Sequence, residues 1–75
     1  MSEKVPRISP DKAIKAIKKL GFKLVRQSGS HQVYLNDAGI RVVIPYHSNK
    51  PLHPKIIKTM LRDLNLTIEE FKKLY

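Results

Sequence analysis

The chain has 75 residues, of which 41% are hydrophobic and 28% charged, which suits one small globular domain and excludes a deep cavity for a large cofactor. It contains no cysteine, which excludes a disulfide framework and a cysteine-ligated zinc site and fits a cytoplasmic protein. Fifteen lysines and arginines against six acidic residues give a net charge of +9, which favours a polyanionic partner over a membrane surface.

Residues 1–8 are predicted to form a mobile basic arm, without the apolar stretch of a signal peptide. A helix is expected to follow, because Ser9 suits an N-cap and Pro10 suits the first helical position, and Gly21 is expected to end it. Four apolar residues share one face of this helix: Ala13, Ile14, Ile17 and Leu20. Four lysines share the opposite face: Lys12, Lys15, Lys18 and Lys19.

Three strands are predicted next, at residues 22–27, 31–35 and 40–44. The first strand is expected to place Phe22 and Leu24 on one side. The turns between the strands are predicted at Ser28-Gly29-Ser30 and at Asn36-Asp37-Ala38-Gly39, where glycine and asparagine supply the unusual backbone angles of tight turns.

A polar loop is expected at residues 46–53, after Pro45 ends the third strand. Pro54 is predicted to open a second helix that ends at Asn65, and Thr67 with Glu70 forms the capping box of a short third helix. The order α-β-β-β-α with a short C-terminal helix predicts an α+β domain over residues 9–75. We expect two layers, a three-stranded antiparallel sheet and the double-stranded-RNA-binding-like fold.

His31 is the leading candidate for chemistry, because imidazole exchanges protons near neutral pH and RNA cleavage needs such a group. The strand alternation places His31 with Val33 and Leu35 on one face. If that face meets the helices, His31 lies half enclosed at its tip. The alternative is a strand-edge histidine that is bonded to a neighbouring carbonyl group.

The other candidate site residues surround this histidine in the sequence. Ser28, Gly29 and Ser30 are predicted to contact phosphate, with an ordinary turn as the alternative. The predicted phosphate-contacting cations are Lys12, Lys15, Lys19, Arg26 and Arg41. His47 is a candidate for a second proton-transfer group, or a solvated loop residue. Tyr34 and Tyr46 could stack a base, although packing at the sheet edge is the alternative that we favour.

An ordered set of motifs resembles the HicA (YcfA-like) toxins over roughly residues 11–72. The motifs are Leu20-Gly21-Phe22, Gly29-Ser30-His31 with Val33-Tyr34, Val43-Ile44-Pro45-Tyr46-His47, and Leu52 before an Ile/Leu-rich helix. Two positions depart from the family pattern: His53-Pro54-Lys55 stands where Pro-Gly-Thr is common, and Asn65 stands where glycine is frequent.

The resemblance implies a double-stranded-RNA-binding-like fold and the activity of an mRNA interferase, an endoribonuclease that does not need the ribosome. It implies a toxin–antitoxin system in which a HicB-like antitoxin protein is the partner. By motif match, the catalytic histidine is His31, and the Pro-x-His element falls on Pro45 and His47.

No cofactor is expected, and a zinc site is not expected, because His31, His47 and His53 lack the short spacing of zinc ligands. Cleavage is expected to be independent of metal, because no cluster of carboxylates lies near the motif: Asp37 is in a turn, and Glu69 and Glu70 are at a helix start. Two alternatives stay open. One is a non-catalytic RNA-binding module of the same fold, and the other is a basic interaction domain for an acidic protein.

Overall fold

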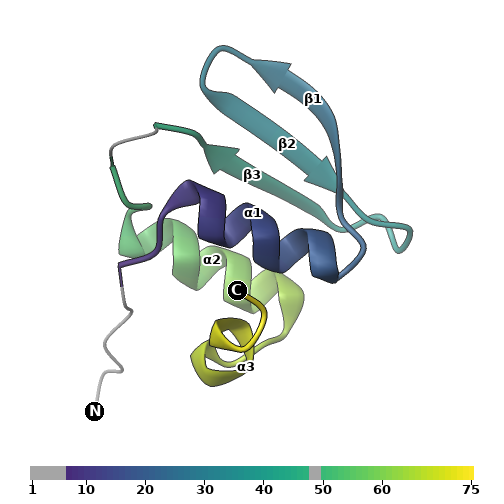
Figure 1. Cartoon of the computed structure of the whole chain (residues 1–75). Coiled ribbons are helices and arrows are strands. Elements are labelled where there is room, and N and C mark those ends of the chain that lie inside the picture. The colour runs from purple at the N-terminus through teal and green to yellow at the C-terminus, as the bar shows by residue number, and fades with distance from the viewer. Residues whose placement is uncertain (1–6, 48–49) are drawn as a thin grey trace.

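The computed structural model describes residues 7–47 and 50–75 as three helices and three strands (Figure 1). The elements in chain order are α1 (Pro10–Lys19), β1 (Lys23–Ser28), β2 (His31–Leu35), β3 (Arg41–Pro45), α2 (Pro54–Leu64) and α3 (Ile68–Lys72). The three strands form one antiparallel sheet. The predicted α+β fold and its α-β-β-β-α order with a short third helix are therefore confirmed. Residues 1–6 of the predicted arm and residues 48–49 of the predicted loop lie outside the described residues.

The helices begin and end at the predicted residues because the local capping chemistry is strong. The Ser9 side chain accepts a hydrogen bond from the backbone N–H of Lys12 at 3.2 Å. The Thr67 and Glu70 pair forms the complete capping box of α3. Asn65 takes the left-handed conformation, with φ 56° and ψ 46°, at the end of α2. These residues satisfy backbone groups that a helix terminus otherwise leaves without partners.

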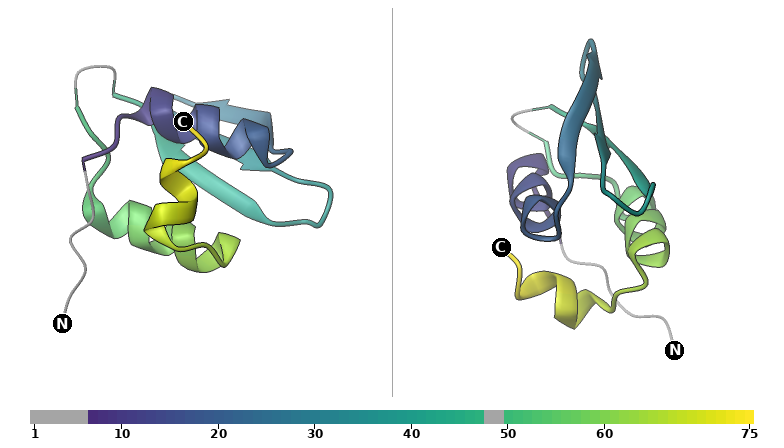
Figure 2. Two further views of the ribbon diagram at one scale, coloured as in Figure 1. Left: turned by 60° about the horizontal axis from the view of Figure 1, so that its bottom comes forward. Right: turned by 90° about the vertical axis from the view of Figure 1, so that its right-hand side faces the viewer.

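The sheet has the order β1-β2-β3, so β2 is central and the other two strands are edges. The first strand begins one residue later than predicted and contains a bulge between Leu24 and Arg26. Leu24 pairs with the inward-facing Tyr34, on the side predicted for it, but it is 46% exposed whereas Phe22 is buried. The reason is that the hairpin of β1 and β2 extends away from the helices, as the right-hand view of Figure 2 shows. In this part of β1, a side chain on the inner face has no helix to pack against and stays exposed.

The core lies between the sheet and the helices and extends to α3, where Phe71 is fully buried. It also takes in Ile8, which is fully buried and whose carbonyl accepts a 2.8 Å hydrogen bond from the Leu52 N–H. Ile8 is therefore part of the domain and not of a mobile arm, which corrects the predicted boundary at residue 9. In the described part of the chain, no helix has the length and apolarity needed to cross a membrane.

The two long helices start at the same end of the molecule (Figure 1). The β1–β2 turn and the segment after β3 also lie at this end, which we call the loop end. The Ile8–Leu52 hydrogen bond ties the chain just before α1 to the chain just before α2 there. Two segments that are far apart in the sequence are thus fixed side by side at the loop end.

The alternation along β3 is tested by the same substitution at two neighbouring residues. Val42 is 5% exposed and Val43 is 37% exposed, so they lie on opposite faces. Val42→Thr should lower the free energy of unfolding by about 1–3 kcal/mol, because it buries a hydroxyl group. Val43→Thr should change it by no more than about 0.5 kcal/mol. Urea denaturation followed by circular dichroism measures both, and equal losses would contradict the register.

Candidate active site

His31 is the first residue of the central strand β2 and has a paired neighbour on each side. Its Cα lies opposite Ser28 of β1 and opposite Pro45 of β3. Its side chain is exposed. Because a residue paired on both edges has little backbone freedom, the imidazole projects into solvent from a rigid position.

His31 lies on the face of the sheet that points away from the helices. Tyr34 is 2% exposed and belongs to the core, whereas His31 and Leu35 are exposed. Since side chains alternate along a strand, Gln32 and Tyr34 face the helices, and His31 lies with Val33 on the outer face. The condition for a half-enclosed His31, that Val33 and Leu35 face the helices, is therefore not met, and the imidazole is exposed instead. The strand turns the large Tyr34 ring toward the helices. The Tyr34 hydroxyl can be buried because it donates a 2.7 Å hydrogen bond to Gln32 Oε1.

The turn before His31 has a conformation that requires its glycine. Gly29 has φ +59°, in the left-handed region that other residues rarely adopt. The Gln27 side chain donates a 3.3 Å hydrogen bond to the Gly29 carbonyl and braces the turn from β1. Ser28 is exposed and Ser30 is half-buried. The turn therefore holds two hydroxyl groups next to His31, as its sequence predicts.

Tyr46 connects three parts of the loop end. Its backbone N–H donates a 2.6 Å hydrogen bond to the Ser30 carbonyl, which extends the pairing of β2 and β3 by one residue beyond His31. Its hydroxyl donates a 2.7 Å hydrogen bond to Asp11 Oδ1 at the start of α1. That hydrogen bond and partial burial raise the pKa of Tyr46 above its ordinary value. The next residue is His47, whose side chain is exposed. Because it is adjacent to Tyr46, the two Tyr46 hydrogen bonds also fix the position at which His47 leaves the sheet.

Two of the other sequence candidates have structural roles. The Tyr34 ring packs in the core from the central strand, not at the sheet edge, and burial raises its pKa, so the ring is not exposed to a nucleotide base. The Nδ1 atom of His53 accepts a 3.0 Å hydrogen bond from the Lys55 N–H and caps α2. The sequence predicts His53 at the helix start, but its capping role is visible only in the structure, because histidine is an uncommon N-cap.

The candidate cations fall into two sets that lie on different surfaces. Arg26 pairs with Val33 and Arg41 pairs with Leu35, so both arginines belong to the outer face that carries His31. Lys23 also pairs with Leu35 and joins this face, although the sequence analysis did not select it. The second set is on α1, in the other layer of the fold: Lys12, Lys15 and Lys19.

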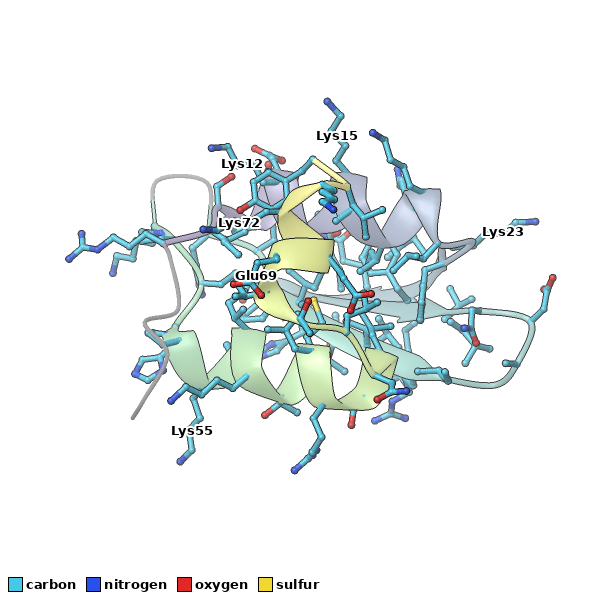
Figure 3. The ribbon with its side chains drawn as sticks, turned by 90° about the horizontal axis from the view of Figure 1, so that it is seen from below. Lys12, Lys15, Lys23, Lys55, Glu69 and Lys72 are labelled. Atoms are coloured by element: carbon cyan, nitrogen blue, oxygen red, sulfur yellow. The ribbon has the colours of Figure 1, made fainter. Side chains whose placement is uncertain are left out.

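Figure 3 shows Lys12 and Lys15 projecting from α1, and Lys55 projecting from α2 in the opposite direction. The Lys12 ammonium lies 5.6 Å from the centroid of the Tyr75 ring. That distance allows a cation–π contact with the end of the chain. The lysines of α1 thus form a positive surface of their own, separate from the sheet.

Acidic and histidine side chains are dispersed. Within residues 7–47 and 50–75, no three of them are placed to hold a metal ion together. Asp11 is engaged by Tyr46, and Glu69 and Glu70 lie on α3.

The comparison with known families agrees with this arrangement. The model of the family described as the HicA toxin of bacterial toxin–antitoxin systems matches residues 10–66. The match runs from the first residue of α1 to just beyond α2, so it contains the whole sheet, the Gly29 turn and the Tyr46 tether. Among curated proteins, none matches the chain. Because the matched region covers most of the chain and all of the candidate site, the protein belongs to the HicA family and is the toxin of a toxin–antitoxin system.

Proposed function

We propose that this toxin is an endoribonuclease that cuts mRNA without the ribosome and that uses His31 as its proton-transfer group. The observation that carries the proposal is the exposed imidazole at the start of the rigid central strand. It lies on an open sheet face together with Arg26 and Arg41. A long, flexible substrate can lie on such a face, whereas a small molecule would find no enclosure.

The chemistry needs a base at the 2′-hydroxyl and an acid at the leaving oxygen. The neutral His31 imidazole takes the proton of the ribose 2′-hydroxyl, whose oxygen attacks the adjacent phosphorus while the bond to the 5′-oxygen breaks. The leaving 5′-oxygen then receives a proton. In our proposal His31 supplies that proton in turn or His47 does so, because His47 follows two residues after Pro45, the cross-strand partner of His31.

The arginines of the outer face neutralise the phosphates on either side of the cut bond, and the serines of the turn donate hydrogen bonds to the phosphate oxygens. The lysines of α1 attract the RNA from a distance and contact its flanking phosphates. Tyr46, unlike Tyr34, is only partly buried, so its ring is the one available to a base at the loop end.

We propose that this mechanism works without a metal ion or another cofactor. A metal-dependent nuclease needs carboxylates close to the cut bond. Here Asp11 accepts the Tyr46 hydroxyl and Asp37 lies in the β2–β3 turn, at the far end of β2 from His31.

Family membership implies an antitoxin as partner. We propose a HicB-like protein that covers His31 and the loop with His47, so that binding and inhibition coincide. The charge of +9 favours an acidic antitoxin, which electrostatic attraction brings to the toxin quickly.

Replacement of the imidazole tests the catalytic role. His31→Gln should lower the rate of RNA cleavage by about 10²–10⁴-fold, because the amide cannot exchange protons near neutral pH. Its affinity for RNA and its thermal stability should be those of the wild type, since the side chain is exposed. His47→Gln is the matched variant and shows whether the second histidine participates.

The measurement is cleavage of a labelled RNA in the presence of EDTA, with all proteins purified side by side. Wild-type activity in His31→Gln would refute the catalytic role. Activity that disappears in EDTA and returns with Mg²⁺ would refute the metal-independent mechanism. RNA binding without any cleavage would instead favour the non-catalytic binding module.

The two sets of cations are tested by the salt dependence of RNA affinity in the His31→Gln background, where the RNA stays intact. Arg26→Gln and Lys15→Gln should each reduce the slope of log affinity against log salt by about 1, because each removes one phosphate contact. Lys55→Gln should leave the slope unchanged, since Lys55 points away from Lys15 (Figure 3). An unchanged slope in Lys15→Gln would show that Lys15 contacts no phosphate and would favour RNA binding by the sheet face alone.

Tyr46 is a positioning residue, because its hydroxyl holds the loop end together through Asp11. Tyr46→Phe keeps the ring and removes the hydrogen bond, so kcat should fall by about three- to tenfold while KM stays constant. Asp11→Asn retains an accepting oxygen and should keep most of the activity. A fall in KM or an unchanged kcat in Tyr46→Phe would contradict the positioning role.

A further inference from the structure

The edge of the sheet that faces α2 is open. Strand β3 is paired with β2 on one side, and a groove of about 690 Å³ lies between its other side and α2. Arg41, Val42 and Val43 all line the groove. Since successive side chains of a strand point to opposite faces, three consecutive lining residues mean that the backbone edge of β3 forms one wall.

The hydrogen-bonding pattern shows which backbone groups face this groove. Tyr46 bonds to Ser30 and Asn36 bonds to Ile40 across the β2–β3 pair. In an antiparallel ladder such pairs alternate, so the even-numbered residues of β3 bond to β2. The N–H and C=O groups of Arg41 and Val43 therefore point away from β2 and into the groove.

The side chains of the groove combine an apolar floor with basic edges. Val42, Ile56 and Met60 contribute the apolar surface, and Arg41 and Lys55 bring the positive charges. A carboxylate, Asp63, also lines the groove, but it lies 3.6 Å from the guanidinium of Arg62. The local balance is positive, as is that of the whole chain.

We propose that this groove is the docking site for an extended acidic segment of a partner protein, which adds to β3 as a fourth strand. The outward-pointing backbone groups supply the ladder, alternate apolar side chains of the segment enter the floor between β3 and α2, and its carboxylates pair with Arg41 and Lys55. A second copy of the toxin is disfavoured as occupant, because each copy carries a charge of +9.

The inference rests on the antitoxin partner that the proposed function invokes, and it says how that partner binds. Adjacent strands are spaced by about 4.8 Å, so an added strand lies about 10 Å from β2. From there, the partner's side chains on the outer face reach the surroundings of His31. The docking strand thus explains how a partner can be anchored at an edge and still cover the site.

The test uses the full-length His31→Gln toxin and a ten-residue peptide of alternating valine and glutamate. A peptide of alternating valine and lysine is the matched control. On titration, the amides of Arg41 and Val43 should shift in the NMR spectrum and exchange more slowly with deuterium, because they enter a new ladder. The lysine peptide should bind more weakly by about three- to tenfold.

A charge reversal then separates specific docking from general attraction. Lys55→Glu should lower the affinity for the glutamate peptide and raise the affinity for the lysine peptide, each by about three- to tenfold. The substitution suits the first turn of a helix, where a carboxylate is favourable, so α2 should stay intact. RNA cleavage by Lys55→Glu in the otherwise wild-type protein should be unchanged.

Several outcomes would overturn the inference. They are unprotected Arg41 and Val43 amides at saturation, equal binding of the two peptides, and protection that depends on toxin concentration and so reveals a second copy. None of these results depends on catalysis. The cleavage assay alone would refute the ribonuclease proposal, and the peptide titration alone would refute the docking proposal.

Discussion

The burial of Tyr34 is the constraint on which the rest of the structure depends. Its ring packs in the core from the middle strand, opposite Val42 of β3, and its hydroxyl donates a hydrogen bond to Gln32. Because side chains alternate along a strand, the inward orientation of Tyr34 fixes the face on which each neighbouring residue of β2 lies. His31 is forced outward, and the arginines paired with Val33 and Leu35 share its face.

The loop end explains how a domain of this size can hold a site without a cavity. Three hydrogen bonds gather four segments there: Ile8 with Leu52, Tyr46 with Ser30, and Tyr46 with Asp11. The helices contribute their starting residues, and the sheet contributes the turn before His31. The strand ladder fixes the backbone of His31, and Tyr46 ties the end of β3 to Ser30 and to Asp11.

The sheet offers partners two different surfaces. Its outer face is basic, open and suited to a polyanion. Its β3 edge opens into the groove beside α2, where backbone groups and an apolar floor suit an extended peptide. The two surfaces meet at Val43, which lines the groove and is also exposed on the outer face. An occupant of one surface is therefore close enough to affect access to the other.

The sequence by itself determined the order of the elements and nearly all of their ends, because caps and turns are local. Ser9, Asn65 and the pair of Thr67 and Glu70 act through neighbours three or four residues away, and Gly29 acts through its own φ. The motif around His31 could also be read from the sequence, since a proton-transfer group and a tight turn are properties of a few adjacent residues.

Only the tertiary structure decided which face of the sheet carries His31. The segment from His31 to Leu35 has apolar residues in both phases, so its inward side depends on how Tyr34 packs against residues far away in the chain. The same holds for the buried Ile8, the tether from Tyr46 to Asp11, the separation of the arginines from the lysines of α1, and the open edge of β3. Each depends on the positions of segments distant in sequence, and those positions are set by the packing of the whole core.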